Sequence, residues 1–125
     1  MNHAGSLRIE DPEQFFKERG GLHDSSIVEM IWRQETAELS IEVDDLNANF
    51  EGPEYRGAQP AIIRFIGVQT FSCDLTSIEG RMNIFETTVS KGSTGPIDVV
   101  ISTWSSIAII RIRCSELIVA AAEVA

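Results

Sequence analysis

The stretch "SIVEMIWRQETAELSIEVD", residues 26–44, decides the fold class. In its second half, apolar Leu39, Ile41 and Val43 alternate with polar neighbours, which is the period of a strand with one buried face. Its first eight residues are strand-like as well, and the polar residues "QET" separate the two halves. Two strand-like runs joined by a short polar link are typical of a β-hairpin.

The same kind of pattern continues to the end of the chain. Short apolar runs rich in β-branched residues are separated by Gly, Pro, Asn and Ser, and the links are too short for helical crossovers. The sequence therefore predicts an all-β fold, an antiparallel sandwich or flattened barrel of about eight strands. Besides the hairpin, the expected strands cover residues 61–68, 70–78, 81–89, 97–104, 107–114 and 116–121.

The N-terminal region differs from the rest. We expect residues 1–9 to be flexible and residues 10–21 to form one short helix. Asp11 can cap this helix, Pro12 suits its first position, and a Gly-Gly pair ends it. With 125 residues and no linker, the sequence indicates a single domain over residues 1–125.

Charge narrows the possible partners. The formal net charge is −9, and residues 1–60 carry 13 acidic and 5 basic side chains. Nucleic acid and anionic membranes attract basic surfaces, so neither is an expected partner. No apolar run approaches the roughly 20 residues needed to span a bilayer. Cys73 and Cys114 lack motif spacing in a chain without a secretory signal, which favours buried free thiols and a cytoplasmic location over a disulfide.

His23 and Asp24 are the only candidates for catalysis. Metal-dependent phosphohydrolases with a His-Asp pair need further histidines, and the only other histidine is His3. A Ser-His-Asp triad needs the carboxylate on one imidazole nitrogen, whereas adjacent residues entering a strand point to opposite faces. We therefore expect a structural role, with His23 bonded to the backbone of a neighbouring segment. The sequence favours a protein that is not an enzyme.

The segment 44–55 is acidic and rich in turn-forming residues. Asp45, Asn47 and Asn49 alternate like the first ligands of an EF-hand loop, but the sixth and twelfth positions hold Phe50 and Arg56 instead of Gly and Glu. No metal is predicted, although a looser calcium site of Asp44, Asp45, Asn47 and Glu51 stays an alternative. No cofactor is predicted either, since "KGSTGP" at 91–96 has the wrong order for a phosphate-binding loop.

The same segment is the expected binding surface. The leading hypothesis is a non-enzymatic binding module, of the immunity or adaptor type, that docks a basic protein partner by electrostatic steering and aromatic anchoring. One alternative is a small-molecule-binding β domain with His23 as a polar contact, and a weaker one is a hydrolase that uses His23. The residues expected at the surface are Asp44, Asp45, Asn47, Asn49, Phe50, Glu51, Glu54 and Tyr55.

The C-terminal run "ELIVAA", residues 116–121, is more apolar than one half-buried strand requires. A terminal strand often lies at a sheet edge, where exposed apolar residues invite pairing. The sequence therefore favours a homodimer, with burial of both faces inside the sandwich as the alternative.

Two motifs also resemble a group of small bacterial proteins of unknown function. These motifs are "LHDSSI", beginning at residue 22, and "DDLNANFEGPEYRGAQPAIIRFIGV", residues 44–68. The resembling pattern is a Leu-His-Asp opening, one hairpin, an Asp-Leu/Asn-Phe/Pro-Glu-Tyr loop and an Ile-x-Phe-x-Gly-Val strand. The resemblance implies an all-β fold and assigns no activity or functional residue.

Overall fold

The fold is an antiparallel β-sandwich. A computed structural model describes residues 3–50, 55–75, 82–92, 95–104 and 108–122. These residues form nine strands, one helix and one 3-10 turn, in the order β1 (His3–Arg8), α1 (Pro12–Glu18), η1 (Gly20–Leu22), β2 (Ile27–Arg33), β3 (Glu38–Val43), β4 (Ala61–Ile66), β5 (Thr70–Leu75), β6 (Ile84–Lys91), β7 (Ile97–Thr103), β8 (Ala108–Cys114) and β9 (Glu116–Ala122).

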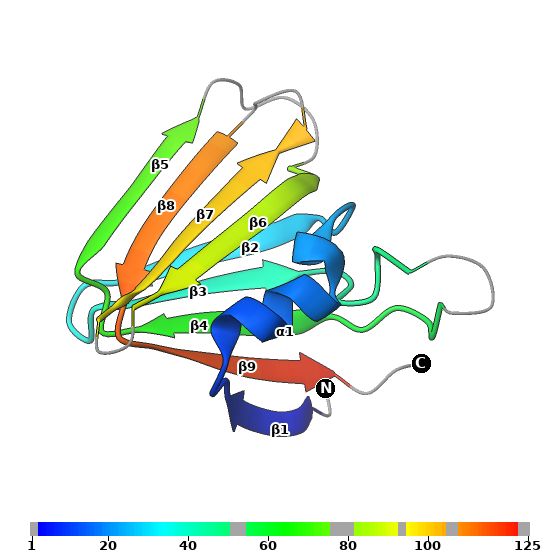
Figure 1. The fold of residues 1–125 in the computed structure, drawn as a ribbon, viewed down its shortest axis with the longest axis horizontal. Helices are drawn as coiled ribbons and strands as arrows, with labels where there is room; N and C mark the ends of the chain where they lie inside the picture. The colour runs from blue at the N-terminus through cyan, green and yellow to red at the C-terminus, as the bar shows by residue number, and fades with distance from the viewer. Residues whose placement is uncertain (1–2, 51–54, 76–81, 93–94, 105–107, 123–125) are drawn as a thin grey trace.

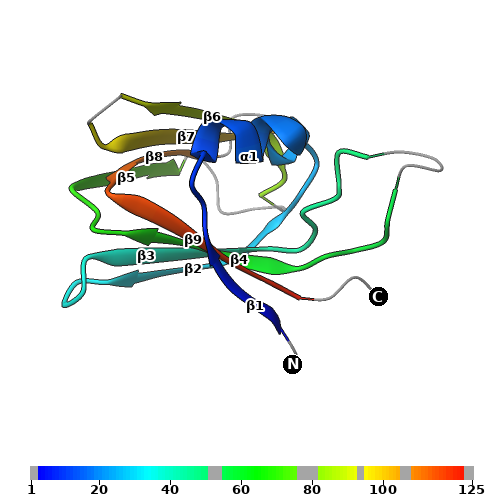
Figure 2. The same ribbon diagram turned by 60° about the horizontal axis from the view of Figure 1, so that its bottom comes forward.

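The strands make two sheets that pack face to face. One sheet has the order β1-β9-β4-β3-β2, and the other has the order β5-β8-β7-β6. Figure 2 shows them as two layers, and all neighbouring strands within each layer are antiparallel. The predicted sandwich is therefore confirmed, and the described residues form no closed barrel.

The core lies between the layers, where the alternating apolar residues meet. Leu39, Ile41 and Val43 of β3 are buried, as their spacing predicted, and Phe65 of β4 is fully buried beside them.

The burial pattern of β2 does not follow simple alternation. Strict alternation would place Ile27 and Met30 on opposite faces, but the β2–β3 register shifts between Ile27 and Glu29. This bulge turns both apolar side chains toward the core, because one extra residue reverses the alternation.

The N-terminal segment forms regular structure where we expected flexibility. Residues 3–8 make β1, which pairs with β9 and covers its outer edge. The C-terminal strand is therefore an inner strand between β1 and β4, and the edge position that the sequence suggested for it is wrong. Leu117 and Val119 enter the core, while Ile118 is half-buried on the outer face between two neighbouring strands.

Helix α1 protects the edge of the four-stranded sheet and lies alongside β6 in Figure 1. The Asp11 carboxylate accepts a hydrogen bond from the Gln14 N–H at 3.1 Å, which caps the helix as expected. Phe16 anchors the helix in the core, and Glu13 accepts the backbone N–H of Lys91 at 3.0 Å. Neither described helix is long and apolar enough to cross a membrane.

Candidate functional site

The backbone around His23 has an unusual conformation. Leu22 and Asp24 have φ angles of 60° and 71°, a left-handed region that costs energy for residues with a Cβ. Between them, the imidazole Nδ1 of His23 lies 2.7 Å from the carbonyl oxygen of Phe85 on β6. Because a carbonyl only accepts, Nδ1 is the donor in this hydrogen bond. His23 thus bonds to the backbone of a segment far away in sequence.

Asp24 lies next to the imidazole, contrary to the sequence argument. The Nε2 atom of His23 is 3.6 Å from the Asp24 carboxylate. An extended backbone would point the two side chains apart, but Asp24 has a positive φ, and its side chain turns back toward His23. Within the described residues, His23 has no serine, threonine or cysteine as a hydrogen-bond partner, so the contacts do not form a catalytic triad.

Two exposed aromatic side chains complete this corner. The Trp104 ring centroid lies 4.6 Å from that of Phe85 and 5.3 Å from that of His23, both in edge-to-face geometry. The indole N–H of Trp104 donates to the Asp24 carboxylate at 3.1 Å. Phe85 and Trp104 are each 43% exposed although they are held in place. We call His23, Asp24, Phe85 and Trp104 the aromatic corner.

In the expected binding segment, Asp45 organises the chain around it. One of its carboxylate oxygens accepts the backbone N–H groups of Asn47 at 2.8 Å and Gln59 at 3.0 Å. The other accepts the phenolic O–H of Tyr55 at 2.7 Å. This hydrogen bond to a carboxylate raises the pKa of Tyr55. Both Asp45 oxygens, which the alternative calcium site would use as ligands, therefore already accept hydrogen bonds from N–H and O–H groups.

The other residues of the segment have mixed roles. The Asp44 carboxylate accepts the backbone N–H of Ser26 at 2.8 Å, and buried Asn47 donates to the carbonyl of Gly57 at 3.0 Å. Phe50 is half-buried, whereas Asn49 and Tyr55 are exposed. Glu51 and Glu54 lie outside the described residues. Among the described residues, no three His, Cys, Asp or Glu side chains come together as a metal centre requires.

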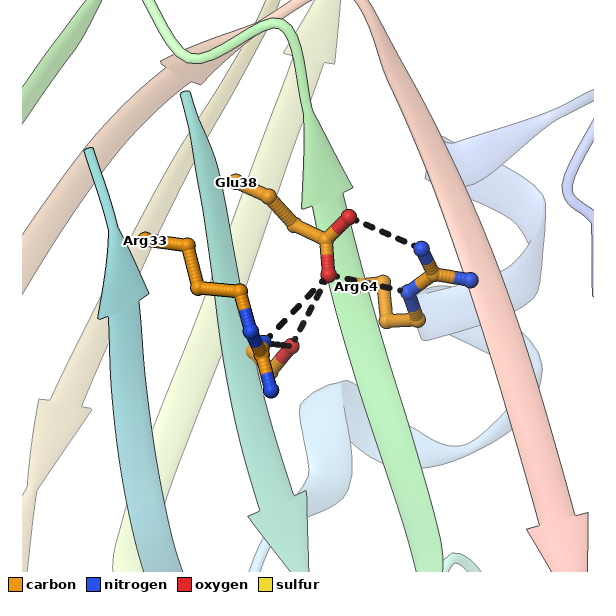
Figure 3. Close-up of polar contacts among 4 residues, drawn as sticks. Arg33, Glu38 and Arg64 are labelled. Atoms are coloured by element: carbon orange, nitrogen blue, oxygen red, sulfur yellow. Dashed lines mark hydrogen bonds and ion pairs between the residues drawn. The ribbon is translucent and has the colours of Figure 1, made fainter. Parts of the chain in front are cut away.

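A third feature lies on the outer face of the five-stranded sheet. Glu38 of β3 lies between Arg64 of β4 and Arg33 of β2 (Figure 3). Arg64 donates two hydrogen bonds to the Glu38 carboxylate, at 2.8 and 3.1 Å, and Arg33 lies 3.5 Å from it. The bond from Arg64 lowers the pKa of Glu38 and raises that of the guanidinium. Arg33 also donates to the hydroxyl of Ser40 at 3.3 Å.

The outer face also has a shallow groove of about 410 Å³, and Arg33, Glu38 and Arg64 line one end of it. Glu29 and Glu42 lie at its other end and face each other directly in the β2–β3 register. Their side chains make no hydrogen bond or ion pair with the residues that the structure describes. Ile31 faces Ser40 midway along the groove, and Ile62 faces Glu42 at its acidic end. We call this feature the outer groove.

No protein-family model, curated protein or solved structure matches this chain. The resemblance to the Leu-His-Asp group of bacterial proteins therefore stays a prediction. Phe85, Trp104 and most residues of the outer groove look like ordinary strand positions in the sequence, which therefore does not single them out. Only Trp104, a large aromatic residue at the end of the expected strand 97–104, was a detectable signal.

Proposed function

We propose that this protein is a non-enzymatic binding module that docks a basic protein partner through the aromatic corner. The observation that carries the proposal is the pair of half-exposed rings, Phe85 and Trp104, fixed beside the carboxylate of Asp24. This replaces Phe50 and Tyr55 as the proposed anchors. Phe50 is half-buried, and no second ring packs against Tyr55 among the described residues, whereas Trp104 packs against both Phe85 and His23.

The rigidity of the corner supports this proposal. Aromatic residues that are already held in their bound position lose little conformational entropy on binding, and for this reason they are common at interaction hot spots. Nδ1 of His23 and the indole N–H of Trp104 are both bonded within the corner, so the surface offered to a partner is mainly ring face and carboxylate. Both attract arginine and lysine side chains, through cation–π contact and ion pairing.

Overall charge supports the same class of partner. A net charge of −9 steers basic proteins toward this chain and repels acidic ones. Glu86, the neighbour of Phe85 on β6, adds an exposed acid near the corner. The proposed mechanism is electrostatic approach followed by stacking of a cationic side chain on Trp104 or Phe85.

The test uses Trp104 as its own reporter. The sequence has two tryptophans, so a Trp32→Phe background leaves Trp104 as the sole indole. Titration with a capped hexa-arginine peptide should change its fluorescence until saturation, and a hexa-glutamate peptide should not. Asp24→Asn should weaken binding about 3- to 5-fold, the size expected for one exposed ion pair.

Glu10→Gln is the matched control, because it removes one exposed acid that is not part of the aromatic corner. Equal weakening by Asp24→Asn and Glu10→Gln would show general charge attraction and contradict docking at the corner. A titration without saturation would contradict it too.

A homodimer is a second proposal, now through β1 instead of β9. Within the described residues β1 pairs only with β9, and Leu7 on β1 is 67% exposed. An unpaired edge with an exposed apolar side chain favours pairing with a second copy. Light scattering should give a dimer mass for the wild type and a monomer mass for Leu7→Lys. A monomeric wild type would contradict the proposal.

We also propose a cytoplasmic location. Cys73 and Cys114 are both free thiols in the structure, as predicted. Free thiols are common in reducing compartments, where disulfides rarely persist. Fractionation of cells that express the native gene, with detection by antibody, should find the protein in the cytosolic fraction.

A further inference from the structure

The outer groove carries opposite charges at its two ends. At one end, Glu29 and Glu42 face each other across β2 and β3. Like charges directly opposite each other on a sheet destabilise it. A bound ammonium group would relieve this repulsion, because neither carboxylate has a cationic partner among the described residues. This end of the groove is therefore suited to a positive group.

The other end has one positive charge in excess. Arg33 and Arg64 share the single carboxylate of Glu38, and their side chains are 49% and 38% exposed. A guanidinium carries five N–H donors, and Arg64 uses only its Nε and one Nη on Glu38. The remaining donors can bind a second carboxylate, the group that arginine recognises best.

The space between the ends limits the length of the ligand. Glu38 and Glu42 are four residues apart on β3, which is about 13 Å at the rise of a strand. Arg64 faces Ser40, only two residues or about 7 Å from Glu42, so the charged ends are separated by about 7–13 Å. A free-ended peptide of two or three residues extends over about 7–10 Å. The groove volume of about 410 Å³ is within the range of small-molecule sites, and Ile31 and Ile62 offer an apolar contact for the middle residue.

We propose that the outer groove binds a short peptide with two free ends. Its ammonium group pairs with Glu29 and Glu42, its carboxylate pairs with Arg33 and Arg64, and its central side chain contacts Ile31 and Ile62. The groove and the aromatic corner share no residue. The inference is therefore independent of the protein partner proposed above.

The experiment compares three forms of the tripeptide Ala-Leu-Ala: free at both ends, acetylated at the N-terminus, and amidated at the C-terminus. Each is titrated into the isotope-labelled protein, and the amide shifts of Ser40, Glu42 and Ile62 are followed. The free peptide should give saturable shifts. Either cap should weaken binding about 5-fold, as expected for the loss of one ion pair near the surface.

Two variants assign the ends of the peptide. In Glu29→Gln/Glu42→Gln, acetylation should no longer weaken binding, whereas amidation still should. In Arg33→Gln, the effect of amidation should shrink and that of acetylation should stay. Arg33 is replaced and Arg64 is kept, because Arg64 donates two hydrogen bonds to Glu38. Loss of Arg64 would therefore disturb the sheet as well as the proposed site.

The control is Glu10→Gln/Glu86→Gln, which makes the same change of net charge on other elements and should bind all three peptides as the wild type does. Three outcomes would overturn the proposal: equal affinity for the free and both capped peptides, shifts that map away from the groove, or no saturation. None of them bears on the aromatic corner, since the Trp104 titration reports on that surface alone.

Discussion

The imidazole of His23 bonds to the backbone carbonyl of Phe85 over a distance of 2.7 Å, although 62 positions separate the two residues. The contact joins the segment before β2 to the beginning of strand β6. Backbone hydrogen bonds continue the connection, from Asp24 N to Ile84 O at 2.8 Å and from Ile84 N to Ser25 O at 2.7 Å. His23 thus helps to hold the two sheets together at this corner.

The first prediction concerns this hydrogen bond. We expect His23→Ala to lower the free energy of unfolding by about 1 kcal/mol, the usual effect of losing one hydrogen bond at a half-buried site. Urea denaturation, followed by circular dichroism, measures the change. A variant as stable as the wild type, with lost binding at the aromatic corner, would show instead that His23 serves recognition.

The second prediction concerns Gly21, whose φ is +66°. A Cβ at this position would lie 3.1 Å from the backbone N and O of Thr87 on β6, where backbone atoms cannot easily move away. Strained φ and close contact together should make Gly21→Ala less stable by about 2 kcal/mol. Gly92→Ala is the control, because the nearest atom to its Cβ is 3.6 Å away. Equal melting temperatures for the two variants would refute the argument.

The third prediction separates the two cysteines. The sequence predicted two buried thiols, which is correct for Cys114 and wrong for Cys73. Cys73 is exposed because it lies on β5, an edge strand that the facing sheet does not cover. Burial raises the pKa of Cys114 to about 12, so it has almost no reactive thiolate at neutral pH. Iodoacetamide should modify one thiol in the native protein and both in urea, and Cys73→Ser should abolish the native reaction.

The fourth prediction is a pH dependence that arises from Glu38. The bond from Arg64 keeps the pKa of Glu38 below its ordinary value of about 4.3. A carboxyl whose pKa is depressed by folding stabilises the native state above its unfolded pKa, and this contribution disappears as the pH falls through the folded pKa. The stability difference between the wild type and Glu38→Gln should therefore be constant near neutral pH and shrink below about pH 4. A difference independent of pH would contradict the ion pair.

The fifth prediction uses the single tyrosine of the sequence, Tyr55. Its O–H donates to Asp45, and this bond raises its pKa above the ordinary value of about 10. Ultraviolet titration of the phenol should therefore give a midpoint above that of free tyrosine. Asp45→Ala should move the midpoint down, because the carboxylate that favours the protonated phenol is gone. An unchanged midpoint would mean that the two side chains are apart in solution.

The sequence by itself determined the local structure of this chain. Alternation in β3 identified its buried face, and Asp11 and Pro12 marked the start of α1, whereas the Gly-Gly pair lies inside η1, after the helix has ended at Glu18. These features depend on residues close together in the chain, since strand period, helix capping and turn preference act over a few positions. For the same reason the fold class and most strands agree with expectation.

Only the tertiary structure decided which strands are neighbours and which side chains meet. The N-terminal segment had no strong local pattern, yet it forms β1 because β9 offers a free edge, and this pairing makes β9 an inner strand. The aromatic corner joins Asp24 to Trp104 across 80 positions, and the outer groove joins Glu38 to Arg64 across 26. Such contacts depend on sheet order and register, which local patterns do not encode, because the same strand can pair with any other strand whose faces match.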